Sequence, residues 1–174
     1  SPSITVSTAG EYTVTQSVNG CSSLAGSGIA VPKEIPAAPT VNVVNECESS
    51  VLTASDFTGS LLWSNGATSS SITVATAGIY SVTQTVNGCS GLAGSGTATP
   101  KTTPLAPTIS VANNCGNSEL TASNITGSLL WSTGETNASI TVTSGGIYSV
   151  TQAVDGCSSL VGSGIAAPKI IPSA

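Results

Sequence analysis

The sequence repeats itself with a period of 68 residues, and this repeat restricts the fold more than any other feature. Cys21, Cys89 and Cys157 are 68 residues apart, and Cys47 and Cys115 have the same separation. The text around them recurs as well: ITVSTAGEYTVTQSVNGCSSLAGSG is followed by ITVATAGIYSVTQTVNGCSGLAGSG and ITVTSGGIYSVTQAVDGCSSLVGSG. Self-similarity at a fixed period of this length is typical of arrays of small structural units. We therefore expect a tandem array rather than one globular domain.

Proline-rich stretches mark the boundaries between the repeats. Three such stretches, VPKEIPAAPT, TPKTTPLAPT and APKIIPSA, each carry one lysine and are typical of short, semi-stiff linkers. They predict two complete repeats at 39–106 and 107–174, preceded at 1–38 by the last three strands (E, F and G) of another repeat. A partial sheet with an open apolar face is not stable alone, so either the first half of that unit precedes Ser1 or a neighbour covers the face, and we favour the first.

The composition and the residue pattern favour strands throughout. Only 6% of the residues are charged and 3% are aromatic, while β-branched and small residues dominate, which is typical of short strands and turns. Alternation of apolar and polar residues predicts the following strands in the repeat 39–106: 40–44 (A), 50–55 (B), 61–64 (C), 70–75 (E), 79–86 (F) and 89–99 (G). Gln84 falls on the apolar face of strand F, where we expect its amide to bind backbone groups.

Turn and aromatic residues predict how these strands are arranged. Asn-Gly or Asp-Gly follows strand F in every copy, the strongest short-range signal for a tight β-hairpin. One tryptophan per complete repeat lies in strand C, and one tyrosine opens strand F, as in Ig-like sandwiches with a tyrosine corner. We expect the aromatic residues Trp63, Trp131, Tyr12, Tyr80 and Tyr148 to pack in the cores. The predicted fold class is all-β, with tandem Ig-like β-sandwich repeats built from short antiparallel strands.

The five cysteines predict disulfides, since zinc sites need CxxC pairs or histidines and the chain has neither. We favour pairing inside each repeat, Cys47 with Cys89 and Cys115 with Cys157, which leaves Cys21 unpaired. Strand F is long, however, and places the A–B and F–G turns at opposite ends of a sandwich. The alternative joins successive repeats through Cys47 and Cys157.

The sequence offers few residues for catalysis or for binding nucleic acid. Lys33, Lys101 and Lys169 are its only cations and the net charge is -5, so it lacks the basic face that nucleic acid or an anionic membrane surface requires. No apolar run approaches the roughly 20 residues of a membrane-spanning helix. Without histidine, the serines and threonines have no obvious general base. Glu46, Glu48 and Asp56 form a weak calcium candidate, because the next repeat has Asn114, Gly116 and Asn124 instead. We expect no enzyme activity, cofactor or metal.

The run GxYxVTQxVNGC, preceded by LTAS, LLWS and a cysteine just before strand B, resembles the Ig-like repeats of very large surface proteins of gliding bacteria. That resemblance implies adhesin stalks exported by the type IX route, at the bacterial cell surface, with neighbouring repeats as the main partners. We therefore expect a structural stalk that carries a distal binding tip. Two alternatives stay open: a ligand- or carbohydrate-binding module of a secreted protein, and repeats that associate laterally into a filament or sheath.

Overall fold

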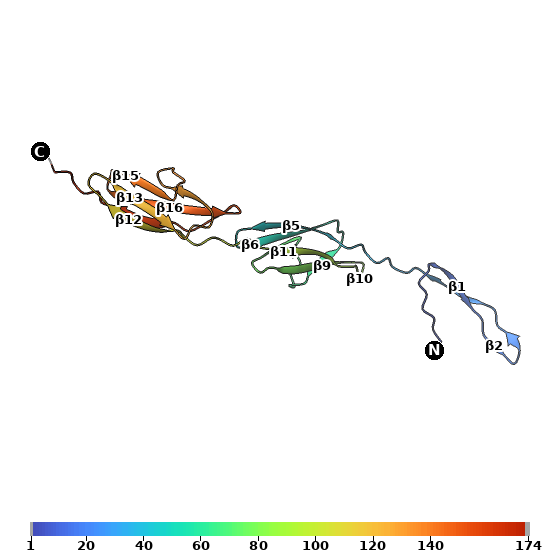
Figure 1. The fold of residues 1–174 in the computed structure, drawn as a ribbon. Helices are drawn as coiled ribbons and strands as arrows, with labels where there is room; N and C mark the ends of the chain where they lie inside the picture. The colour runs from blue at the N-terminus through green and yellow to red at the C-terminus, as the bar shows by residue number, and fades with distance from the viewer. Residues whose placement is uncertain (1, 173–174) are drawn as a thin grey trace. The chain divides into compact units, whose positions relative to one another are not determined.

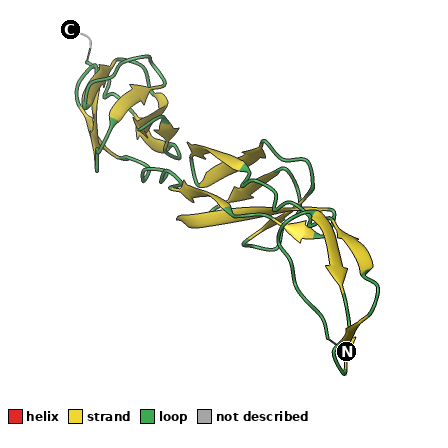
Figure 2. Cartoon of the chain, turned by 90° about the vertical axis from the view of Figure 1, so that its right-hand side faces the viewer, coloured by secondary structure: helices red, strands yellow, loops and turns green. Residues whose placement is uncertain are grey.

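The computed structural model describes residues 2–172, which form strands and loops without any helix (Figures 1 and 2). No helix in this range could therefore cross a membrane. Residues 2–38 contain β1 (Gly10–Val14), β2 (Ser17–Val18), β3 (Cys21–Ser22) and β4 (Gly26–Ala30). Residues 39–106 contain β5 (Thr40–Glu46), β6 (Ser49–Ser55), β7 (Ser60–Trp63), β8 (Ser71–Val74), β9 (Gly78–Val86), β10 (Cys89–Ser90) and β11 (Gly94–Ala98). Residues 107–172 contain β12 (Thr108–Asn113), β13 (Ser118–Ser123), β14 (Ser128–Trp131), β15 (Ser139–Val142), β16 (Gly146–Val154), β17 (Cys157–Ser158) and β18 (Gly162–Ala166).

The chain forms two compact units, whose boundary runs through the strands of residues 40–98. Unit 1 comprises Ser1–Val41, Ala54–Ser70 and Ser81–Ser95. Unit 2 comprises Asn42–Thr53, Ser71–Tyr80 and Gly96–Ala174. Unit 1 therefore contains β1–β4, β7 and β10, and unit 2 contains β8 and β12–β18 with most of β5 and β6, while β9 and β11 are divided between the two.

Unit 2 contains a complete Ig-like sandwich. One sheet has the order β12-β13-β15, and the other has β14-β16-β17 with β18 also paired to β16. In Ig lettering these are strands A-B-E and C-F-G, the two layers of that fold. Both layers contribute to one core, made of Leu120, Ala122, Leu129, Trp131, Ile140, Val142, Val150 and Ala166. The predicted all-β, Ig-like class is confirmed. The same strand order recurs in the sheets β5-β6-β8 and β7-β9-β10 with β11.

The predicted hairpins and the buried positions of the two tryptophans are also confirmed, whereas Tyr12, which we expected in a core, is half-buried beside an open hollow. Asp155 and Gly156 have φ values of 51° and 83°, as a type I′ turn requires, and both other copies of the turn share positive φ. The Tyr148 hydroxyl donates to the carbonyl of Ser144 over 3.1 Å, which is a tyrosine corner. Trp131 is 2% exposed, whereas Tyr148 is half-buried and packs against the edge of the core. Trp63, also 2% exposed, and half-buried Tyr80 follow the same pattern.

Strand G, which we predicted as one continuous strand, is broken in two. In unit 2, β17 pairs with the end of β16, and β18 pairs with its beginning. At the break, the Ser159 hydroxyl accepts a hydrogen bond from the backbone N–H of Gln152 over 3.0 Å and donates one to the carbonyl of Leu160 over 2.7 Å. A side chain thus replaces a ladder hydrogen bond, which frees the chain to bend between the two strands.

The predicted strand E of residues 1–38 is absent. Residues 3–6 have the sequence SITV, like β15, but form no strand, while β1 pairs with β4 and β2 with β3. In unit 2, β15 pairs with β13, and the described residues 2–38 contain no counterpart of β13. The sequence SITV therefore becomes a strand only where a neighbouring strand supplies hydrogen-bond partners.

Candidate functional site

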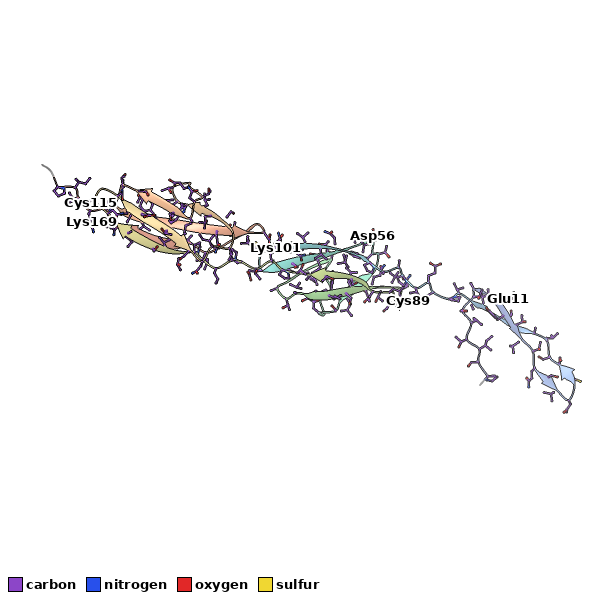
Figure 3. All side chains as sticks on the ribbon, in the orientation of Figure 1. Glu11, Asp56, Cys89, Lys101, Cys115 and Lys169 are labelled. Carbon is purple, nitrogen blue, oxygen red and sulfur yellow. A yellow bond between two sulfur atoms is a disulfide. The ribbon has the colours of Figure 1, made fainter. Side chains whose placement is uncertain are left out.

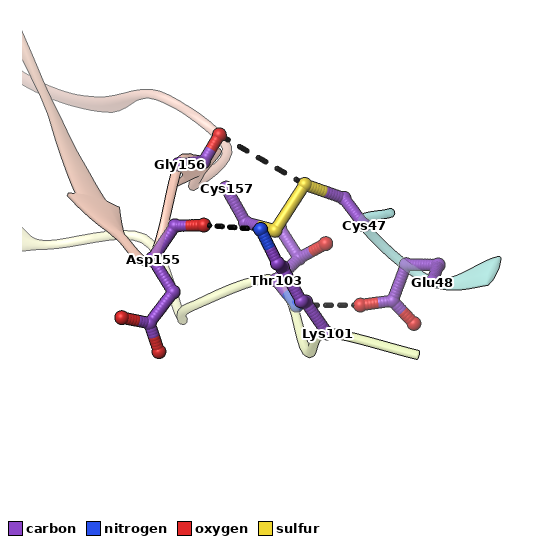
Figure 4. Close-up of a disulfide and its surroundings, with 7 residues drawn as sticks. All are labelled: Cys47, Glu48, Lys101, Thr103, Asp155, Gly156 and Cys157. Carbon is purple, nitrogen blue, oxygen red and sulfur yellow. Dashed lines mark hydrogen bonds between the residues drawn. A yellow bond between two sulfur atoms is a disulfide. The ribbon is translucent and has the colours of Figure 1, made fainter. Parts of the chain in front are cut away.

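A disulfide joins two successive repeats of the sequence. Cys47 lies in the turn between β5 and β6, and Cys157 opens β17 (Figure 4). Their Cα atoms are 5.6 Å apart and 110 residues apart in sequence, and both belong to unit 2. Cys157 is fully buried. This is the alternative pairing considered from the sequence, and it makes the junction between repeats the candidate functional site.

Our preferred pairing inside each repeat, Cys47 with Cys89 and Cys115 with Cys157, was wrong. Within unit 2, Cys157 pairs with Val154 at one end of β16, whereas Ala166 pairs with Gly146 at the other end. Cys115 lies near that other end, where it bridges to Lys169, just after Ala166. The nine residues of β16 span roughly 26 Å, far beyond the reach of a disulfide. Cys21, Cys89 and Cys115 are free (Figure 3 labels the last two).

Lys101 lies in the linker beside this disulfide and forms hydrogen bonds with residues next to each of the two cysteines. Its backbone N–H donates to the carbonyl of Glu46 over 2.9 Å, and its carbonyl accepts from the N–H of Glu48 over 2.7 Å. Its ammonium group donates to the carbonyl of Asp155 over 3.0 Å, two residues before Cys157 (Figure 4). Lys101 therefore connects the turn that carries one cysteine with the hairpin that carries the other.

Glu48 adds a second anchor for the linker. Its carboxylate accepts hydrogen bonds from the backbone N–H and the side chain of Thr103, and these bonds lower the pKa of Glu48 below its usual value. Glu48 is one of the carboxylates in our weak calcium candidate. Within residues 2–172, no three Asp, Glu, His or Cys side chains lie close enough to hold a metal ion. The residue one period later is Gly116, so this anchor is not a feature of every repeat.

The depressed pKa of Glu48 predicts a pH-dependent contact. A carboxylate with a lowered folded-state pKa stabilises its contact above the ordinary glutamate pKa of about 4.3, and this contribution is lost as the pH falls through the lower folded-state value. We expect the amide resonance of Thr103 to shift in that acidic range in a titration followed by NMR. Glu48→Gln should abolish the shift, and an unchanged Thr103 amide in the parent protein down to about pH 2 would contradict the contact.

Buried Gln152 fixes the far end of the linker. Its side-chain amide donates to the carbonyls of Leu105 and Asn124 over 2.7 and 3.1 Å. Its carbonyl oxygen accepts from the N–H groups of Thr126 and Gly127 over 2.7 and 3.1 Å.

The expectation that the strand-F glutamine binds backbone is confirmed. It holds for Gln84 too, whose amide donates to the carbonyl of Ala37 over 2.8 Å.

The linker between repeats is therefore anchored at alternate residues rather than acting as a loose spacer. The N–H of Thr99 donates to the Asn45 side chain over 3.0 Å. Lys101, Thr103 and Leu105 make the contacts described above. Some of these contacts are to residues 45–48 and others to residues 152–155, so the same seven residues, 99–105, are bound by both repeats.

The same arrangement recurs one period earlier, within unit 1. The Lys33 ammonium group donates to the carbonyl of Asn87 over 2.7 Å, as Lys101 does to Asp155. Half-buried Cys89 follows this hairpin, in the place of Cys157. One period later, Lys169 exchanges backbone hydrogen bonds with Asn114 and Gly116, as Lys101 does with Glu46 and Glu48. We predicted no such role for the three lysines from the sequence, although their exact recurrence beside the prolines was a signal for it.

No protein-family model and no curated protein matches the sequence. Solved structures with a similar chain path include murine CEACAM1b, with 13% identity, a TM-score of 0.38 and coverage of 76% of this chain and 100% of that chain. A chain from the crystal structure of the mouse coronavirus receptor-binding domain complexed with its murine receptor gives 14% identity, a TM-score of 0.42 and the same coverage.

Proposed function

We propose that this chain is part of a non-enzymatic, extracellular stalk in which successive Ig-like repeats are cross-linked by disulfides. The observation that carries the proposal is the Cys47–Cys157 bond between successive repeats. A disulfide inside a repeat would stabilise that repeat alone, whereas a bond between repeats restricts how one can rotate against the next. Resistance to bending is a property that a stalk needs and that a catalytic or ligand-binding domain does not.

The remaining junction contacts support the same function. Lys101 and Gln152 hold the linker against the residues on either side of it, so the covalent bond is accompanied by hydrogen bonds to the backbone. Disulfides persist in oxidising compartments, which favours a secreted or cell-surface location. The resemblance to stalk repeats of surface adhesins from gliding bacteria gives the finer form of the proposal. In that form the repeats project a distal binding tip from a bacterial cell, exported by the type IX route.

Small-angle X-ray scattering tests whether the junction stiffens the chain. A compact protein of 174 residues has a radius of gyration of about 16 Å, and we expect a clearly larger value with the profile of a semi-rigid particle. Replacing both Cys47 and Cys157 by alanine should broaden the size distribution. The matched control replaces Cys115 and Cys89, which hold the same two positions in the repeat but are free here. A compact particle, or equal profiles for both double variants, would refute the stalk.

A further inference from the structure

The Cys47–Cys157 disulfide forms a covalent path that bypasses most of the folded chain. Residues 48–156 lie between the two cysteines in sequence, and they include every strand from β6 to β16. The two buried tryptophans, Trp63 and Trp131, both lie in this closed loop. A pulling force that enters before Cys47 and leaves after Cys157 passes through the sulfur–sulfur bond. The loop of residues 48–156 therefore carries none of that force.

The hydrogen bonds that anchor the linker lie in the same closed loop. The Lys101 ammonium group donates to the carbonyl of Asp155 over 3.0 Å, and the Glu48 carboxylate accepts from Thr103. All four residues lie between the two cysteines in sequence. Tension applied from outside the loop does not pull these groups apart, so the anchored linker is protected together with the tryptophans.

The strands that remain in the path of the force are already extended. Before the disulfide the path follows β5, which is paired with β6, and after it the path follows β17 and β18, which are paired with β16. A strand rises about 3.3 Å per residue, whereas a fully stretched chain reaches at most about 3.6 Å per residue. Stretching the seven residues of β5 therefore gains only about 2 Å.

Force favours unfolding in proportion to the length that unfolding releases. Detaching β5 from β6 releases almost no length, because the strand is already nearly as long as its residues allow. Between Cys157 and Ala166, the residues outside strands are 159–161. There the Ser159 hydroxyl binds the N–H of Gln152 and a neighbouring carbonyl. The slack in these three residues is small beside the length that the closed loop of residues 48–156 would release.

Building on the proposed stalk function, we propose that this chain is a tether that carries tension through the Cys47–Cys157 bond. Pulling loads β5, β17 and β18, and it leaves the strands from β6 to β16 unloaded. Folded domains are only marginally stable, so a small sandwich that lay in the path of the force would unfold under load. The disulfide removes that weakness, because the length of the tether no longer depends on the stability of the sandwiches.

Stretching of single molecules of the full chain tests this path. Handles attached through azide-bearing residues at exposed Thr40 and Ala167 leave every cysteine in place. In the parent protein, the 19 residues outside the loop, 40–47 and 157–167, can reach only about 70 Å, and we expect smooth lengthening without an unfolding step. With Cys47→Ala and Cys157→Ala, all 128 residues between the handles are loaded, and stepwise unfolding should extend them to about 460 Å.

The free cysteines provide the matched control for stretching. Cys89→Ala and Cys115→Ala remove thiols that form no bond, so this variant should stretch like the parent protein. An unfolding step in the parent protein would show that the loaded path is not already extended and would overturn the proposal. A Cys47/Cys157 variant that stays short until the handles detach would also overturn it, because its sandwiches would then carry tension without the bond.

Stretching and scattering test different properties, so the tether and the stalk can fail separately. Scattering reports how much the chain bends without load, whereas stretching reports which residues a load can unfold. A stiff chain whose parent form unfolds stepwise would keep the proposed stalk and lose the tether. A flexible chain that still lengthens without steps would keep the tether and lose the stiffness.

Discussion

Replacing both Cys47 and Cys157 by alanine is expected to destabilise unit 2 by about 4 to 5 kcal/mol in the chain-entropy description of cross-links. The bond closes a loop of 110 residues, so it removes much freedom from the unfolded chain. Alanine is preferred to serine because Cys157 is fully buried, and a serine hydroxyl there would add a second, unrelated cost. Guanidinium unfolding followed by tryptophan fluorescence measures the loss.

The repeat provides a matched control for this experiment. Cys115 and Cys89 occupy the same repeat positions as Cys47 and Cys157, yet both are free. Their double replacement by alanine should leave the unfolding midpoint nearly unchanged. A reducing agent should lower the stability of the parent protein to that of the Cys47/Cys157 variant and have no further effect on the variant. Equal losses in the two double variants would show that the disulfide does not hold the junction.

The sequence was sufficient to predict the fold because its signals are local. Alternating residues define the strands, and Asn-Gly or Asp-Gly defines the hairpin, as the positive φ values at Asn87 and Gly88 confirm. The aromatic positions follow from the strand order, since strand C carries Trp131 in the core. Strand E of the first segment was mispredicted because its formation depends on a contact that is not local. SITV at residues 3–6 has the correct pattern, but its strand depends on a partner that the described part of the chain does not contain.

The junction could be predicted only in part, because it depends on how one repeat meets the next. Periodicity places the cysteines within the repeat but is equally compatible with pairing inside a repeat or between repeats. The length of strand F argued against pairing inside the repeat. The structure shows that this geometric argument outweighs the usual pattern, in which small secreted domains form their disulfides within one unit. The contact of Lys101 with Asp155 is a side-chain bond to a backbone carbonyl. No residue type at position 155 could have signalled it.

Gln152→Leu is expected to destabilise unit 2 by about 3 to 5 kcal/mol, since each buried polar group left without a partner costs about 1 to 3 kcal/mol. The glutamine is 1% exposed and serves two N–H groups, of Thr126 and Gly127, and two carbonyls, of Leu105 and Asn124. Leucine has a similar volume, so the loss reports the hydrogen bonds rather than a cavity. Gln16 is the counterpart in the first segment and is exposed. Gln16→Leu should therefore have little effect, and equal losses at both positions would contradict this assignment.

Gln152→Glu separates the two halves of this hydrogen-bond set. The carboxylate can still accept the hydrogen bonds of Thr126 and Gly127 but cannot donate to the carbonyl of Leu105. The linker therefore loses its hydrogen bond, while the turn at residues 126 and 127 keeps both of its hydrogen bonds. Burial and the facing carbonyl disfavour the charged form and raise the folded-state pKa of the new acid. An acid with a raised folded-state pKa stabilises the fold below its unfolded-state pKa, and this contribution is lost as the pH rises. Relative to the parent protein, Gln152→Glu should thus be more stable near pH 4 than at pH 7. Compared with the parent protein at the same pH, hydrogen exchange in the linker should slow as the acid protonates and regains a donor for Leu105.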